Sequence, residues 1–259
     1  QLLDTNTKTR EFKFDSTHYI KALFELMKPR VMSLAIFTCV VGFLIAPYKS
    51  VDYLYAILSI TAVALGSGAA GSLNCWYEAD VDKVMSRTCL RPIPTGRLTK
   101  KEALIFGVLS SFVSVVTLYF FSNLMAASLL ALTILFYVFV YTIWLKRKTP
   151  QNIVIGGAAG ALPPVIGWAI ATGSVSIEPI ILFLIIFVWT PSHFWALSLF
   201  KSEDYKKANI PMLPVTSGVE TTKKNIFVYS ILLFPVAIAP YYIDFLGLIY
   251  LLFSFPLSA

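Results

Sequence analysis

Residues 103–145 read ALIFGVLSSFVSVVTLYFFSNLMAASLLALTILFYVFVYTIWL and contain no Asp, Glu, Lys or Arg. A helix that crosses a bilayer needs about 20 apolar residues, so this stretch has room for two spans, 103–122 and 124–145, joined at Asn123. A backbone in lipid must satisfy its own hydrogen bonds, and these runs are too long and too uniformly apolar for the ~10-residue strands of an outer-membrane barrel. The stretch therefore predicts membrane-spanning helices.

Similar uncharged runs lie on both sides of this stretch. They predict five more complete spans, 31–47, 53–73, 152–172, 179–200 and 225–243, and part of an eighth that begins near Leu246. The chain is 57% hydrophobic and only 14% charged, whereas a soluble domain has about a quarter charged residues. We therefore predict an all-α fold, a polytopic transmembrane helical bundle of seven complete spans and part of an eighth. A cytoplasmic segment, 1–30, precedes a single transmembrane domain, 31–259, whose C-terminal end we expect to be incomplete.

The basic residues are distributed unevenly between the two ends of these spans. Twenty of the 21 Lys and Arg residues lie before the first span or in the loops 74–102, 146–151 and 201–224, and only Lys49 lies in a loop of the other set. The positive-inside rule places the N-terminus and the three basic loops in the cytoplasm. We expect a multi-pass protein of the bacterial cytoplasmic (inner) membrane, with the mitochondrial inner membrane as the alternative. Basic residues split among separate loops argue against nucleic-acid binding.

The first long loop opens with a cluster of polar and acidic residues, NCWYEADVDK at 74–83. If the preceding helix continues, Asn74, Glu78 and Asp82 share one face, because residues four apart differ by only about 40° around the axis. Asp80 then projects from the opposite side. Like charges four residues apart repel each other, and Mg²⁺ prefers oxygen ligands such as carboxylates. The segment therefore indicates a magnesium site, and a solvated helix end is the alternative.

Two arginines, Arg87 and Arg91, follow this acidic cluster. A guanidinium group matches phosphate oxygens with two parallel hydrogen bonds, so a pair of arginines beside a metal site suits a diphosphate. The alternative is that these residues only set the membrane topology.

The sixth span ends in a second group of functional candidates, WTPSHFW at 189–195. A continuous helix here would place His193 and Asp204 on one face. Ionisable residues inside a span tend to be functional, although a single histidine can also be a packing residue. In the fifth span, the small residues and proline pair of 156–164 predict close helix packing and a break.

Five segments together resemble a known family, in its order along the chain. They are 28–34 (KPRVMSL), 74–96, 141–164, 189–197 (WTPSHFWAL) and 204–215. The chain resembles the protohaem IX farnesyltransferase (haem O synthase) branch of the UbiA-type intramembrane prenyltransferases. The acidic motif identifies the superfamily, and the fifth-span and His-Phe-Trp segments are specific to the haem branch. The superfamily usually has Asp where this chain has Glu78, and the family bundle has nine spans.

The resemblance implies transfer of the farnesyl group of farnesyl diphosphate to the 2-vinyl group of haem B, with addition of water, giving haem O and diphosphate. The resemblance also implies roles for individual residues in binding the metal, the diphosphate and the haem. Four residues would hold Mg²⁺ or Mn²⁺: Asn74, Glu78, Asp82 and Asp204. Arg87 and Arg91 would bind the diphosphate, His193 and Trp195 the haem, and Lys201 is a further candidate for substrate binding. Four rings are candidates to face the farnesyl cation: Trp76, Tyr77, Phe194 and Trp195.

The expected partners are the lipid bilayer, haem B and farnesyl diphosphate, with hand-over of the product to haem A synthase or a terminal oxidase. Two alternatives remain at this point. A UbiA-type enzyme that prenylates an aromatic quinone precursor would share the acidic clusters but would not need the His-Phe-Trp segment. A secondary transporter would place its binding residues near the bilayer midplane, often in inverted repeats, and the sequence has no such repeat.

Overall fold

The structure, a computed structural model, describes residues 16–47 and 52–258. All regular elements in these residues are helices. The first seven are α1 (Ser16–Leu26), α2 (Pro29–Ile45), α3 (Tyr53–Tyr77), α4 (Ala79–Val84), α5 (Lys100–Phe121), α6 (Leu124–Leu135) and η1 (Phe136–Leu145). The others are α7 (Asn152–Ala161), α8 (Pro163–Thr172), α9 (Ile177–Phe200), α10 (Ser202–Lys207), α11 (Leu213–Thr216), α12 (Gly218–Tyr242) and α13 (Leu248–Ser258).

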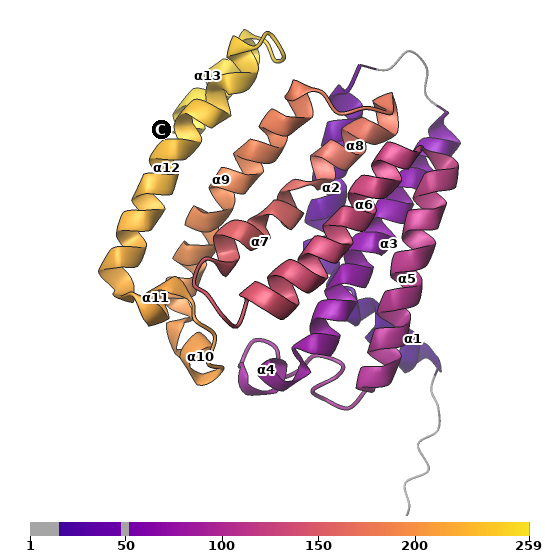
Figure 1. Cartoon of the computed structure of the whole chain (residues 1–259), viewed down its shortest axis with the longest axis vertical. Helices are drawn as coiled ribbons and strands as arrows, with labels where there is room; N and C mark the ends of the chain where they lie inside the picture. The colour runs from indigo at the N-terminus through magenta and orange to yellow at the C-terminus, as the bar shows by residue number, and fades with distance from the viewer. Residues whose placement is uncertain (1–15, 48–51, 259) are drawn as a thin grey trace, which may run out of the picture.

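The predicted membrane-spanning bundle is confirmed. Within residues 16–47 and 52–258, six helical segments are long and apolar enough to cross a bilayer: Tyr53–Tyr77, Lys100–Phe121, Leu124–Leu145, Asn152–Thr172, Ile177–Phe200 and Gly218–Tyr242. A seventh span forms if α1 and α2, which meet at a bend of 57°, count as one broken helix. The expected part of an eighth span is the short helix α13, which lies against the end of α12 (Figure 1).

Several predicted boundaries are displaced from the observed helix ends. The span predicted at 53–73 continues to Tyr77, and the span predicted at 225–243 begins seven residues earlier, at Gly218. Hydropathy locates where apolar residues begin, whereas capping decides where a helix begins. At Lys100, for example, α5 starts ahead of its apolar run because Thr99 and Glu102 form a capping box.

The fifth span is broken, as its prolines predicted. α7 ends at Ala161 and α8 begins at Pro163, with Leu162 between them. α8 packs closely on α2: a Cβ atom added to Gly167 would lie 1.9 Å from the carbonyl oxygen of Cys39. Only glycine permits this approach of two backbones, in the manner of small-residue contacts between membrane helices.

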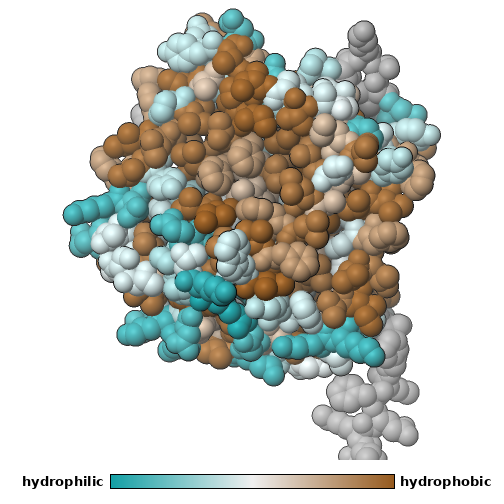
Figure 2. All heavy atoms as spheres, in the orientation of Figure 1, coloured by the Kyte–Doolittle hydropathy of each residue, from teal (hydrophilic) through white to brown (hydrophobic). Residues whose placement is uncertain are grey.

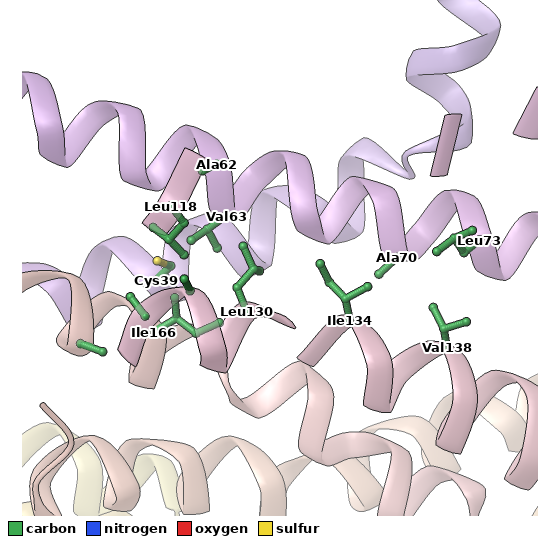
Figure 3. Close-up of a cluster of buried hydrophobic side chains, with 13 residues drawn as sticks. Cys39, Ala62, Val63, Ala70, Leu73, Leu118, Leu130, Ile134, Val138 and Ile166 are labelled. Atoms are coloured by element: carbon green, nitrogen blue, oxygen red, sulfur yellow. The ribbon is translucent and has the colours of Figure 1, made fainter. Parts of the chain in front are cut away.

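The main apolar core lies between α2, α3, α5, α6 and α8 (Figure 3). Its largest fully buried side chains include Leu118, Leu130 and Ile166. This core fixes α3 in the middle of the bundle, so the polar C-terminal end of α3 is held among neighbouring helices.

The described parts of the segments that were predicted to be cytoplasmic lie at one end of the bundle, where α1, α4, α10 and α11 are found (Figure 1). The most hydrophilic surface of the view gathers at this end, below a broad apolar band (Figure 2). Interactions join these segments: Arg97 with Glu25 at 2.6 Å, Arg147 with Asp80 at 2.7 Å, and Ser86 with Asp204 at 2.5 Å. Among the basic residues of the topology prediction, Lys8, Arg10, Lys13 and Lys49 lie outside the described residues.

Candidate functional site

The acidic motif lies at the junction of α3 and α4. Helical hydrogen bonds continue through this junction, because the backbone N–H of Glu78 donates to Asn74 at 3.0 Å and that of Asp82 donates to Glu78 at 2.8 Å. The predicted common face is therefore present. Asn74, Glu78 and Asp82 are each at most 2% exposed, while the side chain of Asp80 on the opposite side is 58% exposed.

Glu78 forms a buried ion pair with Lys146, which follows η1. The ammonium Nζ of Lys146 donates to Glu78 Oε2 at 2.6 Å. Burial alone raises the pKa of Glu78, but Lys146 and Lys28 outweigh burial and hold that pKa below its usual value. The other carboxylate oxygen, Oε1, is buried and has no hydrogen-bond partner among the described residues. This oxygen is available to a further cation or donor.

Asn74 links two more segments to the same face. Lys28, at the bend between α1 and α2, donates to Asn74 Oδ1, and Asn74 Nδ2 donates to Thr142 Oγ1 at 3.0 Å. Lys28 has a left-handed backbone, with φ of 57°, which is unfavourable for a residue with a side chain and more so before proline. Strain of this kind concentrates at functional sites, where the surrounding structure enforces it.

η1 is a π-helical segment, and it positions the residues that face α3. The N–H of Lys146 bonds to the carbonyl of Tyr141, five residues back. Single-turn π-bulges are found frequently at functional sites. Here the wide turns direct Thr142 to Asn74 and Lys146 to Glu78.

The other two carboxylates of the motif, Asp82 and Asp80, are each paired with an arginine. Arg91 Nη1 donates to both carboxylate oxygens of Asp82 at 2.8 Å. On the outer side, Arg147 donates to Asp80 at 2.7 and 2.9 Å, and this hydrogen bond holds the pKa of Asp80 below its usual value. Three cations, Lys28, Lys146 and Arg91, thus converge on the buried face of the motif.

Asp204 lies in α10 and contacts the first long loop through Ser86, which donates to Asp204 Oδ2 at 2.5 Å. The predicted continuous helix from His193 to Asp204 is wrong, because α9 ends at Phe200 and the chain turns at Lys201 before α10 begins. The two residues are therefore not aligned along one helix. The turn instead brings Asp204 across to the loop that follows α4.

The proposed metal ligands are only partly brought together. In residues 16–47 and 52–258, no three His, Cys, Asp or Glu side chains gather closely enough to form a metal site by themselves. Asn74, Glu78 and Asp82 share one face, and Asp204 is linked to the loop beyond them through Ser86.

The substrate-binding candidates differ widely in exposure. Arg87 and Lys201 have exposed side chains with no hydrogen bond or ion pair inside the described part of the chain. His193 is half-buried and its ring stacks on Trp189, with centroids 4.3 Å apart. Trp195 is 1% exposed and packs in a cluster that includes Val81 of α4. Trp195 therefore joins α9 to the acidic motif.

Lys28 and Lys146 are the functional candidates that the sequence prediction missed. They were counted as topogenic charges, because a basic residue at a span end has that ordinary explanation. The side chains of both lysines reach the buried motif, where Lys28 donates to Asn74 and Lys146 donates to Glu78. The signal that could have indicated Lys28 is its place directly before Pro29, where the chain must bend.

The chain is similar to known proteins in both its sequence and its fold. The model of the UbiA prenyltransferase family matches residues 35–259. Protoheme IX farnesyltransferase of Pelagibacter ubique is 63% identical over 250 residues, which cover 96% of this chain and 82% of the relative. The protein of the same name from Parvibaculum lavamentivorans is 56% identical over 228 residues, covering 88% of this chain and 71% of the relative.

Solved structures share the fold. One, from work on digeranylgeranylglyceryl phosphate synthase in membranes, has a TM-score of 0.77 at 20% identity and covers 93% of this chain and 84% of its own. The UbiA homologue of Archaeoglobus fulgidus bound to DMAPP and Mg²⁺ has a TM-score of 0.74 at 19% identity, covering 91% and 82%. With a family match from residue 35 to residue 259 and relatives more than half identical over most of its length, the chain belongs to the UbiA prenyltransferase family, as its motifs predicted.

Proposed function

We propose that this multi-pass membrane enzyme transfers the farnesyl group of farnesyl diphosphate to the 2-vinyl group of haem B, with addition of water, and releases haem O and diphosphate. The observation that carries the proposal is the 63% identity, over 96% of the chain, to a protoheme IX farnesyltransferase. The buried cluster of acids and cations at the α3–α4 junction supplies the chemistry that this reaction needs.

The cations of the site would bind the diphosphate. Lys28, Lys146 and Arg91 each contact one residue of the acidic face. In a buried site these charges interact strongly with an anion, since little water screens them. Arg87 is exposed in the loop that follows α4, and its guanidinium would add a further contact to the phosphate oxygens.

The acidic face also fits a magnesium ion. Its donors are all oxygens, the ligand type that Mg²⁺ prefers, and Glu78 Oε1 is a buried oxygen without a partner among the described residues. Asn74, Glu78 and Asp82 would hold the ion, with Asp204 from the second loop, and Mn²⁺ would serve in its place. When bound, the metal supplies positive charge that stabilises diphosphate as a leaving group.

The protein residues then assist cleavage of the bond between farnesyl C1 and oxygen. The electron pair leaves with the diphosphate, and Lys146, Lys28 and the arginines stabilise the negative charge that develops there. The terminal carbon of the haem vinyl group bonds to C1. The cation left beside the porphyrin ring takes up water and loses a proton, which gives the hydroxyl group of haem O.

The haem would lie on the α9 side of the site. His193 is accessible and its ring is oriented by Trp189, so its imidazole can meet the iron or a propionate. Trp195 is buried and supports this side by packing towards α4. Lys201, exposed at the end of α9, is suited to a haem propionate.

The basic end of the bundle would face the cytoplasm of a bacterial cell, with the enzyme in the cytoplasmic membrane. The product is a membrane-soluble haem, so we also propose hand-over to haem A synthase or a terminal oxidase in the same membrane.

The test is a reconstituted reaction. Purified protein in detergent is given haem B, farnesyl diphosphate and Mg²⁺, and the product haem is identified by mass. A parallel reaction replaces haem B with an aromatic quinone precursor. We expect haem O in the first reaction and no prenylated product in the second. The reverse result would assign the enzyme to the quinone-precursor alternative.

A further inference from the structure

The bend between α1 and α2 lies at the edge of the predicted hydrocarbon core. α2 has 17 residues, so it is about 26 Å long, close to the ~30 Å thickness of that core. No charged side chain occurs from Val31 to Ile45, while Lys28 and Arg30 stand at the start of the helix. Basic side chains at a span end mark the headgroup level. α2 therefore crosses the core without α1, and the bend lies among the headgroups.

The angle of the bend keeps α1 near that level. α1 has 11 residues, so a straight continuation of α2 would carry its far end about 16 Å beyond the core. At the observed bend of 57°, the rise along the axis of α2 is only about 9 Å. The headgroup layer is about 5–8 Å thick on each side of a bilayer. Most of α1 therefore lies at headgroup depth.

α1 has one face against protein and one face that no other described element covers. Ala22 and Leu26 are fully buried, in a cluster with residues of α3 and α5. On the opposite face, Ile20 is 65% exposed and Phe24 is 52% exposed. These two residues are four apart, so they share one side of the helix. α2 also packs on α3 and exposes apolar side chains such as Val31 on its outer side. The outer face of α1 thus continues an apolar surface that faces lipid.

The charges beside α1 leave a positive excess. Glu25, the acid of α1, is paired with Arg97 at 2.6 Å. Three exposed lysines form no ion pair within residues 16–47 and 52–258: Lys21 of α1, and Lys100 and Lys101 at the start of α5. The first turn of α5 lies next to α1, because Ala103 packs in the same cluster as Ala22. Glu102 in that turn is engaged by the capping box with Thr99.

We infer that α1 lies in the headgroup layer of the membrane and that its outer face, with Lys21, Lys100 and Lys101, binds anionic phospholipid. Helices that lie in the interface combine an apolar face with basic residues in this way. Each lysine near an anionic surface adds about a fivefold preference for it. The inference does not depend on farnesyl transfer. Because Lys28 follows α1 and donates to Asn74, the lipid contact of α1 also supports one edge of the acidic motif.

The first test measures the depth of α1 with the full chain in lipid nanodiscs. In a background without native cysteines, single cysteines at Ile20 and Phe24 carry a nitroxide. Its collisions are measured with oxygen, which concentrates in the bilayer, and with a nickel chelate, which stays in water. The references are Lys148, exposed in a basic loop, and Phe37, exposed in the middle of α2.

We expect the ratio of oxygen to nickel collisions at Ile20 and Phe24 to lie between the two references. A ratio equal to that at Lys148 would place α1 in water. A ratio equal to that at Phe37 would place it in the hydrocarbon core, as an extension of the span. Either result would overturn the inference.

The second test measures the preference for lipid charge. A fluorophore on the cysteine at Phe24 is quenched by nitroxide-bearing phosphatidylglycerol or phosphatidylcholine at equal mole fraction. We expect stronger quenching by phosphatidylglycerol, and Lys21→Gln should reduce that preference by about fivefold. Lys207→Gln, at an exposed lysine of α10, is the matched control and should leave it unchanged. Equal quenching by both lipids, or equal losses for the two variants, would disprove an anionic lipid site at α1.

Discussion

Lys146 and Glu78 are 68 positions apart in the sequence, and their side chains form a buried ion pair with Nζ and Oε2 2.6 Å apart. Glu78 is 2% exposed, so its charge depends on this lysine and on Lys28. The next residue, Arg147, pairs with the exposed Asp80. Two adjacent basic residues thus form two ion pairs in very different surroundings.

This contrast predicts different effects on stability. Lys146→Met leaves a buried carboxylate without its main partner and should lower the free energy of unfolding by about 3 kcal/mol. Arg147→Met, beside an exposed carboxylate, should lower it by less than about 1 kcal/mol. Unfolding in detergent without metal measures both. The double variant Glu78→Gln/Lys146→Met should regain most of the lost stability but no activity. If Lys146→Met and Arg147→Met lose the same free energy of unfolding, the distinction between a buried and an exposed ion pair is wrong.

Metal removal should abolish activity. A chelator should stop haem O formation, and added Mg²⁺ or Mn²⁺ should restore it. Asp82→Ala should lose activity while remaining folded and membrane-inserted, because it removes an oxygen donor from the buried face. Asp80→Ala, on the opposite side of the helix, is the matched control and should lose less activity. Turnover of Asp82→Ala at the parent rate would disprove the metal site.

His193→Ala should affect the haem substrate and leave the binding of farnesyl diphosphate unchanged. The diphosphate can be bound by cations alone, whereas haem can use an imidazole. We expect His193→Ala to lose haem O formation and to keep its affinity for farnesyl diphosphate and Mg²⁺. Asp82→Ala should show the opposite pattern. Titration of each ligand against each variant measures this, and conversion of haem B by His193→Ala at the parent rate would make the histidine a packing residue.

Labels on the loops should report the predicted sidedness. In a background without native cysteines, single cysteines at Lys83, Lys148 and Lys207, which are exposed, should react from the cytoplasmic side. A cysteine at Lys49 should react from the other side. A membrane-impermeant thiol reagent applied to intact cells and to inverted vesicles measures this. Reaction of any of the three from outside would disprove the span assignment.

The contact of α8 with α2 should not tolerate a methyl group. Gly167→Ala places a Cβ atom against the carbonyl of Cys39, and backbone must move to accept it. We expect a loss of about 1–3 kcal/mol in the free energy of unfolding. Gly160→Ala is the control, because a Cβ atom there meets nothing within 4 Å. Alanine favours a helix more than glycine does, so the free energy of unfolding should stay unchanged or rise slightly. Thermal unfolding of the two variants in detergent measures the difference.

The sequence alone was sufficient for the membrane-spanning class, the family and the shared face of Asn74, Glu78 and Asp82. Each of these depends on local information. The length of an uncharged run is compared directly with the thickness of a bilayer, and a helical repeat places residues four apart on one face without any tertiary contact. The shared face of the three residues, with Asp80 on the opposite side, follows from that repeat, whereas the burial of this face depends on the helices packed around it.

Only the tertiary structure could decide which charges meet. Lys146 looked like a topogenic residue in a basic loop, and nothing in the sequence near it indicates Glu78 as its partner. The contact depends on the wide turns of η1 and on the packing that fixes α3 in the core. The turn at Lys201 likewise removed Asp204 from the helix of His193 and brought it to Ser86. Such pairings arise because the energy of a buried charge depends on every segment around it, while a sequence pattern describes one segment at a time.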